Sequence, residues 1–390
     1  MKIAMVLDDS IDRPDGVQQY VLTLGAFLER AGHEVHYVCS EATRTDVMVH
    51  SLARNVGVTF NGNGLRIPLP TSRAMLRDFL ERERYDVIHV QIPHSPLFAA
   101  RVVDEARRVQ ARTVRIVGTF HILPDGAVSE YGTRVLGRVQ RRNLARFDAF
   151  CAVSPPARDF AARAFGIDAE VIPCSIDTTL FAPAPSPKMV SLSPSAPPNR
   201  ESDTIFSEGG GRRLRVAFLG RLVERKGVLE LVRALAALPG DVRDRLEVRI
   251  GGKGPLRGDL EVAIESSGLG GIVTLDGFVS EEDKPAFYAA ADIAVFPATG
   301  GESFGIVLIE AMASGAGVVL GGANPGYLSV LGDRPEVSVD PRDTAAFAGA
   351  LCRLIEDDAL RAELHAEQSE RVRRFDVATV GEQILALYDA

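Results

Sequence analysis

Two glutamates eight residues apart lie in the stretch G-G-E-S-F-G-I-V-L-I-E-A-M-A-S-G at residues 300–315. The small residues favour a tight loop, and the apolar residues after them predict a helix that opens near Ser303. On a helix, eight steps bring Glu302 and Glu310 within about 80° of each other, two turns apart. Two such carboxylates suit two parts of one polar ligand, although a carboxylate at a helix start can equally be only a cap. The amides of Phe304 and Gly305 would face an anion.

A second candidate is the turn G-R-L-V-E-R-K-G at residues 220–227, which follows an apolar strand. Arg221, Arg225 and Lys226 cluster where a helix is expected to begin. Guanidinium forks, an ammonium group and the helix dipole together suit a pyrophosphate. The alternative is a solvated basic loop.

Two further positions follow predicted strands in the first half. Gly16, in D-D-S-I-D-R-P-D-G-V-Q-Q-Y at residues 8–20, lets backbone approach a ligand, while Asp15 can be an N-cap. His121, in G-T-F-H-I-L-P, ends an apolar strand, where a histidine can be either functional or structural. His89 lies inside a strand and is expected in the core.

Several chemistries are excluded by missing patterns. The chain has no D-x-D triplet, so a metal-clamped nucleotide is not expected. His36, His50, His94 and His365 show no ligand spacing, and we expect neither a metal site nor a cofactor. There is no G-x-S-x-G, G-K-S/T or H-E-x-x-H motif. No G-x-G-x-x-G follows the first strand, which argues against a dehydrogenase.

Apolar strand-like runs alternate with helical periods almost throughout, which predicts parallel sheets with helices on both faces. In the first half we expect strands near 2–8, 35–40, 86–91, 113–119 and 148–153, and helices near 17–31, 72–84, 96–110, 134–147 and 155–165. In the second half we expect strands near 214–220, 246–251, 272–275, 292–296 and 317–320, and helices near 227–238, 255–267, 282–290, 304–314 and 342–356, with two more before the C-terminus.

The pattern occurs twice, with a break between. Residues 182–211 hold six Pro, six Ser and three Gly without apolar periodicity, which predicts a linker or surface loop. We therefore expect an α/β protein of two Rossmann-like doubly wound domains facing a central cleft, with ligands beyond the carboxyl ends of the strands. The expected boundaries are 1–181 for the first domain, 182–211 for the linker, 212–374 for the second domain, and 375–390 for a C-terminal helix.

Length and composition agree with this organisation. The 390 residues are 46% hydrophobic and 25% charged, as in globular proteins. The sequence contains no run of 18 uncharged apolar residues, so no membrane-spanning helix is expected. The charge of −8 argues against a nucleic-acid partner, but residues 1–182 hold 22 Lys/Arg against 21 Asp/Glu. The first half is thus the better partner for an anionic surface. Four distant cysteines and the early Asp8 favour a cytoplasmic protein with reduced thiols.

The predicted helix at 134–147 is rich in arginine and contains no acid. A basic amphipathic helix can lie on an anionic membrane, and it can equally be a solvated surface. The arginines are Arg134, Arg138, Arg141, Arg142 and Arg146.

The 300–315 block resembles the retaining family-4 glycosyltransferases of the glycosyltransferase-B type. The resemblance spans essentially the whole chain through G-V at 16–17, F-H at 120–121, V-S at 153–154, G-R at 220–221, R-K-G at 225–227 and G-x-G-P at 252–255. Within this family, D-x-P-x-G-V-Q near residues 12–18 makes the sequence most similar to the actinobacterial phosphatidylinositol α-mannosyltransferases.

The resemblance implies an acceptor-side first domain, a nucleotide-sugar-binding second domain and a C-terminal helix that crosses back to the first. It also implies a role for each matching residue. Arg221 and Lys226 would hold the donor pyrophosphate, Glu302 would lie near the transferred sugar, and Glu310 would bind the nucleotide ribose. His121 would stand beside the reacting sugar. The remaining donor positions implied are Gly16, Gly252, Glu281, Lys284, Ser303, Phe304, Gly305 and Ile306.

The chain departs from the mannosyltransferases on the acceptor side. Asp15-Gly16 replaces their Gly-Gly, Asp9 replaces an aromatic residue, and the run I-L-P-D-G after F-H lacks their lysine for the inositol phosphate. A carboxylate beside a pyrophosphate would repel it, so Asp15 is expected to point away or to meet acceptor hydroxyls. The acceptor pocket expected here comprises Asp9, Asp15, Gln18, Asn61 and Arg66.

We therefore expect a retaining, metal-independent hexosyltransferase, with mannose favoured and a lipid-linked or polyol acceptor. GDP-mannose and a UDP-hexose both remain open as donors. The alternatives are a UDP-glucose or UDP-GlcNAc enzyme acting on a glycan or soluble acceptor, a sugar-nucleotide epimerase, and a non-catalytic sugar-nucleotide binder. We expect a cytoplasmic protein that works at the inner face of the plasma membrane.

Overall fold

The computed structural model of the protein describes residues 1–13, 15–60, 63–121, 140–182 and 212–390; for 58–60 and 63–67 only the backbone is described. The described chain forms two compact units. The N-terminal unit contains residues 1–177, 302–306 and 374–390, and the C-terminal unit contains 178–301 and 307–373. The predicted linker at 183–211 lies outside the described residues.

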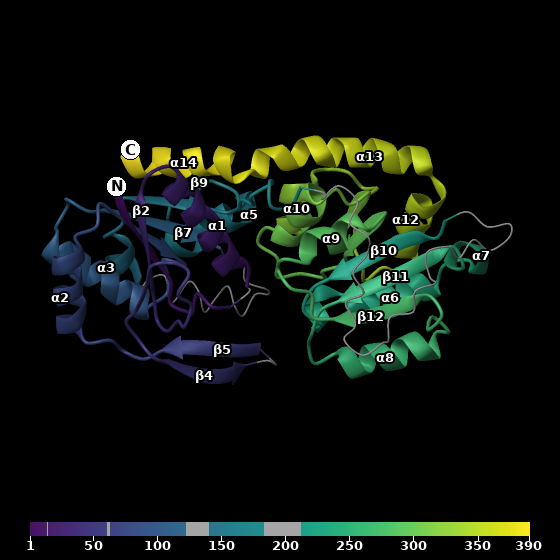
Figure 1. The fold of residues 1–390 in the computed structure, drawn as a ribbon, viewed down its shortest axis with the longest axis horizontal. Helices are drawn as coiled ribbons and strands as arrows, with labels where there is room; N and C mark the ends of the chain where they lie inside the picture. Colours follow the sequence, from purple (N-terminus) through teal and green to yellow (C-terminus); the bar gives the residue numbers. More distant parts are fainter. Residues whose placement is uncertain (14, 61–62, 122–139, 183–211) are drawn as a thin grey trace. The chain divides into compact units, whose positions relative to one another are not determined.

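The N-terminal unit is built on a seven-stranded parallel sheet in the order β3-β2-β1-β6-β7-β8-β9 (Figure 1). The strand order reverses beside β1, which pairs with β2 on one side and β6 on the other. This is the topological switch point at which such sheets bind ligands. The strands are β1 (Lys2–Val6), β2 (Glu34–Cys39), β3 (Val49–Ser51), β6 (Val87–Gln91), β7 (Arg115–Phe120), β8 (Ala149–Ala152) and β9 (Glu170–Val171).

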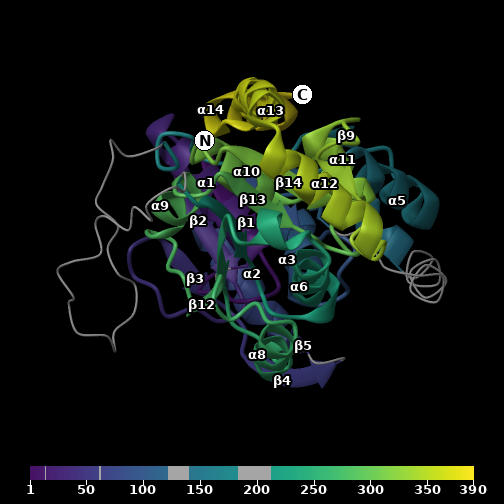
Figure 2. The same ribbon diagram turned by 90° about the vertical axis from the view of Figure 1, so that its right-hand side faces the viewer.

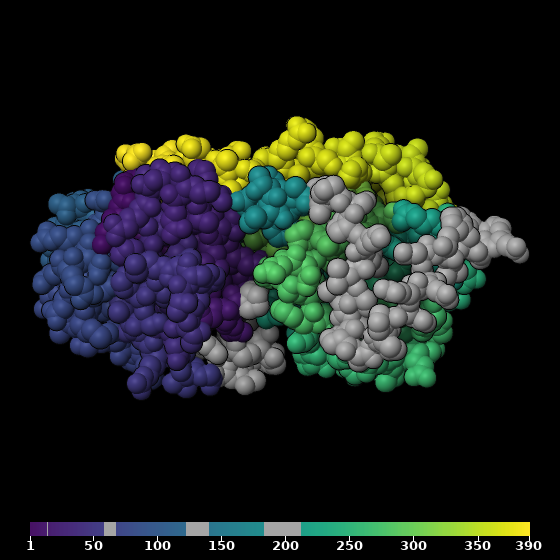
Figure 3. Space-filling view, viewed as in Figure 1, coloured from purple at the N-terminus to yellow at the C-terminus, as the bar shows by residue number. Residues whose placement is uncertain are grey.

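Helices cover both faces of this sheet because alternate strand residues point to opposite sides. One face carries α2 (Arg73–Glu83) and α3 (Phe98–Val109), whose apolar residues join those of β1, β2 and β6 in one core. α1 (Gly16–Arg30) lies beside the C-terminal helix α14 (Val377–Asp389), which runs along the surface of this unit (Figure 3). α5 (Pro155–Phe165) follows β8, and β4 (Asn55–Phe60) and β5 (Asn63–Pro68) form a separate antiparallel hairpin.

The C-terminal unit has a six-stranded parallel sheet in the order β12-β11-β10-β13-β14-β15, with its switch point between β10 and β13. α6 (Val228–Ala236), α8 (Arg257–Ser266) and α12 (Thr344–Glu356) pack into one core on one face (Figure 2). The strands are β10 (Leu214–Leu219), β11 (Leu246–Gly251), β12 (Val273–Gly277), β13 (Ile293–Phe296), β14 (Val318–Gly322) and β15 (Ser338–Val339). The other helices are α7 (Gly240–Arg243), α9 (Lys284–Ala289), α10 (Ile306–Ala313), α11 (Pro325–Leu331) and α13 (Asp358–Arg371).

The predicted pair of doubly wound parallel sheets is confirmed, and each predicted strand is present within a few residues. The helix predicted at 134–147 is described only from residue 140, where 140–144 are helical. All four cysteines are free thiols in the structure. No helix in the described parts of the chain has the length and hydropathy needed to cross a bilayer.

Three histidines of the N-terminal unit are buried as neutral rings. Burial lowers the pKa of His89 to about 3, that of His94 to about 4 and that of His121 to about 3. As predicted, His89 lies in the core; its Nδ1 is 2.7 Å from the hydroxyl of Tyr388 on α14. His94 stacks on Phe120 and lacks a hydrogen bond at Nδ1 among the described residues.

These histidines predict an acid-sensitive fold. In the unfolded chain each of these histidines is protonated below about pH 6.5, whereas in the folded chain it stays neutral down to about pH 3–4. The free energy of unfolding therefore decreases progressively as the pH falls through that window. Each ring contributes a slope of about 1.4 kcal/mol per pH unit. Denaturant unfolding at pH 7 and pH 5 measures the loss. In the variant His94→Phe, the free energy of unfolding should change less steeply with pH, by about 1.4 kcal/mol per pH unit. An unchanged pH dependence would contradict the assignment.

Candidate functional site

The basic turn at 220–227 lies at the switch point of the C-terminal sheet. It leaves β10 and enters a short 3-10 turn, Glu224–Lys226, before α6. The loop after β13 adjoins it, because the amide of Thr299 donates to the carbonyl oxygen of Arg225 at 3.0 Å. Gly227 has a φ of +72°, and a Cβ there would stand 1.7 Å from the carbonyl oxygen of Pro297. Glycine is therefore needed to bring the two loops together.

The carboxyl ends of three strands approach one another closely beside this turn. Gly252 follows β11 with a φ of +136°, and a Cβ there would lie 1.8 Å from the carbonyl oxygen of Gly220. Its amide donates to Gly277 at the end of β12. Gly252 thus has a packing role that its motif alone did not indicate. The next loop carries Phe278, which is 57% exposed and has the Lys253 ammonium 5.0 Å from its ring centroid.

Glu310 belongs to a buried polar cluster on α9 and α10. Its carboxylate is 3.3 Å from the Lys284 ammonium and 3.5 Å from the Tyr288 hydroxyl, while Lys284 is also 2.7 Å from Glu281. Burial raises the pKa of Glu310, and the ammonium of Lys284 opposes that shift. Burial alone would lower the pKa of Lys284, yet the carboxylates of Glu310 and Glu281 raise it overall. Three residues predicted to bind the nucleotide are therefore in direct contact.

The predicted start of the helix carrying Glu310 is wrong. α10 begins at Ile306, not near Ser303, so Glu302 stands before the helix and the angle calculated between the two glutamates does not apply. The small residues that favoured a loop extend it further than expected: Gly301 and Gly305 have φ values of +68° and +108°. Phe304 and Gly305 are buried and lie ahead of the helix.

The segment 302–306 is held by residues of the N-terminal unit. Ser154 donates a hydrogen bond to the carbonyl oxygen of Ser303, and the ring of Phe304 meets Phe375 edge-on at 5.5 Å. A Cβ at Gly16 would lie 3.7 Å from Ile306, an ordinary contact. Glu302 is half-buried. The segment therefore groups with the turn containing Gly16, whereas Glu310 groups with the C-terminal unit.

His121 directly follows β7 and is buried. Its Nε2 lies 2.7 Å from the side-chain oxygen of Gln91, the last residue of β6, and its ring meets Tyr20 edge-on at 5.0 Å. Burial, aided by His89, accounts for its lowered pKa. His121 is therefore a neutral hydrogen-bonding group at physiological pH. Sequence reasoning missed Gln91, although a polar residue ending a strand beside the switch point is a usable signal.

The loop after β1 carries three charged residues that partly neutralise one another. Arg13 lies 3.4 Å from a carboxylate oxygen of Asp9 and 3.4 Å from one of Asp15. Asp15 occupies the N-cap position of α1 but makes no capping bond through its side chain. Gln18 is buried and donates to the carbonyl oxygen of Ser10 at 3.0 Å. The guanidinium of Arg13 explains how a carboxylate is accommodated beside Gly16.

Asp8, in the same loop, is another residue that sequence reasoning did not select. Its carboxylate accepts a hydrogen bond from the amide of Ala99 in the first turn of α3 at 2.6 Å, and burial raises its pKa. Asn61 and the side chain of Arg66, predicted for the acceptor pocket, lie outside the described residues.

Two family profiles match the chain. The family described as Glycosyltransferase Family 4 matches residues 14–180, and that described as Glycosyl transferases group 1 matches residues 203–374. The phosphatidyl-myo-inositol mannosyltransferase of Mycolicibacterium smegmatis is 33% identical over 404 residues, covering 100% of this chain and 94% of that protein. The protein of the same description from Mycobacterium tuberculosis is 31% identical, with 100% and 97% covered.

Solved structures share the fold at lower identity. Anabaena HepE in complex with UDP has a TM-score of 0.73 at 21% identity, with 100% of both chains covered. A glycosyltransferase from Rickettsia africae has a TM-score of 0.73 at 15% identity, with 99% of this chain and 97% of that chain covered.

Proposed function

The chain belongs to the family-4 glycosyltransferases, alongside the phosphatidyl-myo-inositol mannosyltransferases, and we propose that it transfers mannose from GDP-mannose to a lipid-linked inositol or related polyol with retention of configuration. The position of Arg221 and Lys226 is the observation that supports the proposed binding of a nucleotide-sugar donor. Both lie on the turn at the switch point of the C-terminal sheet. In open α/β sheets, ligands bind at that point.

The leaving group is a nucleoside diphosphate, so the barrier falls when its developing charge is stabilised. The cations of Arg221 and Lys226 would supply this without a catalytic metal; one preorganised donor is typically worth about 3–4 kcal/mol. The reaction proposed is a same-face displacement through an oxocarbenium-like species. The leaving phosphate accepts the acceptor's proton, and no covalent enzyme intermediate forms. Glu302 is assigned to the transferred sugar.

We assign the nucleoside to the cluster of Glu310, Lys284 and Glu281. The carboxylate of Glu310 would accept hydrogen bonds from the ribose hydroxyls, with Lys284 holding that carboxylate ionised at 3.3 Å. The exposed ring of Phe278, in the loop leading to this cluster, offers a stacking surface for the base. The other proposed donor contacts are Gly16, Gly252, Ser303, Phe304, Gly305 and Ile306.

His121 would act on the sugar as a neutral hydrogen-bond partner. Its pKa of about 3 excludes an imidazolium acid at neutral pH. Gln91 holds one ring nitrogen and leaves the other for a substrate hydroxyl.

The acceptor side rests on the loop after β1. Asp9 and Asp15 would accept hydrogen bonds from polyol hydroxyls, while Arg13 offsets their charge. A lipid-linked acceptor requires a membrane surface, for which the exposed Arg141 and Arg142 are the described candidates, whereas Arg146 is 2.9 Å from Asp104. Arg134 and Arg138 lie outside the described residues. We place the enzyme at the inner face of the plasma membrane.

The test offers GDP-mannose, UDP-glucose and UDP-GlcNAc separately, each with phosphatidylinositol vesicles or free myo-inositol. GDP-mannose should raise the melting temperature most and yield an α-mannosyl lipid, identified by mass spectrometry and by NMR of the anomeric carbon. EDTA should leave the initial rate intact. Epimerised donor without a transfer product would replace the proposal with an epimerase. Donor binding with neither hydrolysis nor transfer would indicate a non-catalytic binder.

A further inference from the structure

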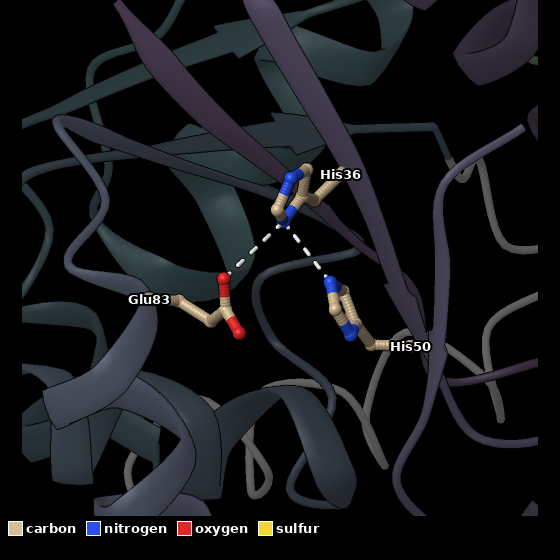
Figure 4. Close-up of side chains that lie close together, drawn as sticks. All are labelled: His36, His50 and Glu83. Carbon is tan, nitrogen blue, oxygen red and sulfur yellow. Dashed lines mark hydrogen bonds and ion pairs between the residues drawn. The ribbon is translucent and has the colours of Figure 1, made fainter.

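A cluster of two histidines and a glutamate lies at the edge of the N-terminal sheet. Among the described residues, His36 on β2, His50 on β3 and Glu83 at the end of α2 form a group whose potential ligand atoms all lie within 4.8 Å of one another. Figure 4 shows His36 between the other two side chains, with both contacts made to the same ring nitrogen. The absence of ligand spacing in the sequence was misleading, because the sheet brings distant residues together.

Several polar groups converge on one ring nitrogen of His36. The Nδ1 of His36 lies 3.0 Å from Nε2 of His50, 3.0 Å from the Tyr85 hydroxyl and 3.9 Å from a carboxylate oxygen of Glu83. One ring nitrogen offers either a single lone pair or a single proton. It can therefore satisfy only one of these three groups at a time, whereas a cation would attract several of them together.

The contact at the other ring nitrogen, Nε2, determines which tautomer His36 adopts. Its Nε2 lies 2.9 Å from a carboxylate oxygen of Glu34, so that nitrogen carries the proton and Nδ1 keeps its lone pair. A carboxylate that holds the far nitrogen of a histidine is the usual support of a metal-bound imidazole.

Two of the three distances within the cluster lie close to those in a site for a first-row divalent ion. Bonds of about 2.0–2.1 Å in a tetrahedral site separate neighbouring ligand atoms by about 3.3–3.4 Å. The contacts of 3.0 and 3.9 Å from His36 Nδ1 bracket that value. Glu83 is the last residue of α2, so the negative end of the helix dipole faces the same point.

We propose that His36, His50 and Glu83 bind one divalent transition-metal ion of the Zn²⁺ class, with a solvent molecule completing the coordination. The ion would join the three-residue edge strand β3 to β2 and to the end of α2. Among the described strands, β3 pairs with β2 alone, and it precedes the β4–β5 hairpin. The site is structural and separate from the proposed transfer chemistry.

The ammonium group of Lys2 competes with a metal ion for the carboxylate of Glu83 and would therefore limit the affinity for the metal. Its ammonium lies 3.0 Å from the Glu83 oxygen that faces His36 and 3.2 Å from Glu34, while Arg82 is 3.0 Å from the other oxygen of Glu83. A divalent ion must displace Lys2 from Glu83, after which the lysine keeps its contact with Glu34. Removing this charge should therefore strengthen metal binding.

The experiment uses the full chain, stripped with EDTA and titrated with Zn²⁺ alone. The parent should bind one equivalent and melt at a higher temperature, and Co²⁺ in its place should give the visible absorption of a tetrahedral nitrogen-oxygen site. His50→Gln and Glu83→Gln should each weaken binding at least tenfold. Lys2→Gln should strengthen it several-fold. His365→Gln, a histidine of the C-terminal unit bonded to Ala316, is the matched control and should bind like the parent.

Circular dichroism without metal verifies that each variant folds. Zn²⁺ binding that survives both His50→Gln and Glu83→Gln, or a parent chain that binds none, overturns the proposal. The Co²⁺ spectrum of the parent decides the matter independently if a variant fails to fold. Transfer activity is a separate readout: lost activity with zinc binding intact would count against the proposed function and leave this site standing.

Discussion

The variant Lys226→Ala should lower kcat/KM for the nucleotide-sugar donor by about a hundredfold or more, with little change in the melting temperature. Lys226 is half-buried on the turn between β10 and α6, so its loss leaves no cavity in the core. The expected effect follows from removing one preorganised cation from a leaving diphosphate, worth about 3–4 kcal/mol. Steady-state kinetics with labelled donor measures it.

Two comparisons isolate the role of the charge. Lys226→Arg should recover part of the activity, because a guanidinium also binds phosphate. Arg233→Ala removes one positive charge from the same unit, where Arg233 pairs with Glu230 on the surface of α6, and it should be nearly silent. Turnover close to that of the parent in Lys226→Ala would remove the proposed phosphate clamp.

The second large effect is expected for Glu310→Gln, which should weaken donor binding about 10–100-fold. The substitution keeps the shape of a side chain that is 2% exposed but deprives both Lys284 and the ribose of a charged acceptor. Hydrogen bonds to charged groups are worth about 1.5–3 kcal/mol. Isothermal titration with GDP and with the intact sugar nucleotide measures the loss, which should be similar for both because they share the ribose.

Breaking a buried ion pair also destabilises a protein, so stability must be separated from binding. The double variant Lys284→Met with Glu310→Gln removes both charges and should recover stability without recovering donor affinity. Glu265→Gln on the exposed face of α8 is the charge-matched control. If Glu310→Gln binds GDP like the parent, the assignment of this carboxylate to the ribose is wrong.

The repeating strand and helix pattern predicted both sheets because parallel strands are buried on both faces. Such strands therefore appear in the sequence as continuous apolar runs. The β4–β5 hairpin was missed: residues 55–60 and 63–68 have no continuous apolar run, and two strands pairing only with each other leave a weak signal. The two-residue strands β9 and β15 are too short for any periodicity.

The candidate site was less accessible to sequence reasoning. Spacing placed Glu310 on a helix correctly, but the backbone of 301–305 depends on glycines at positive φ, and so the helix started later than predicted. Contacts such as Lys284 to Glu310, or Gln91 to His121, join residues far apart in sequence. Only the folded sheets place them together. The same limitation hid the cluster of His36, His50 and Glu83.

The return of residues 374–390 to the N-terminal unit bears on the order in which the protein matures on the ribosome. Val380 and Ile384 of α14 are fully buried there, and Tyr388 reaches His89 at the centre of the sheet. The chain needed for the C-terminal unit has emerged before that segment is translated. The half synthesised first therefore needs residues 374–390 before its own interior can close.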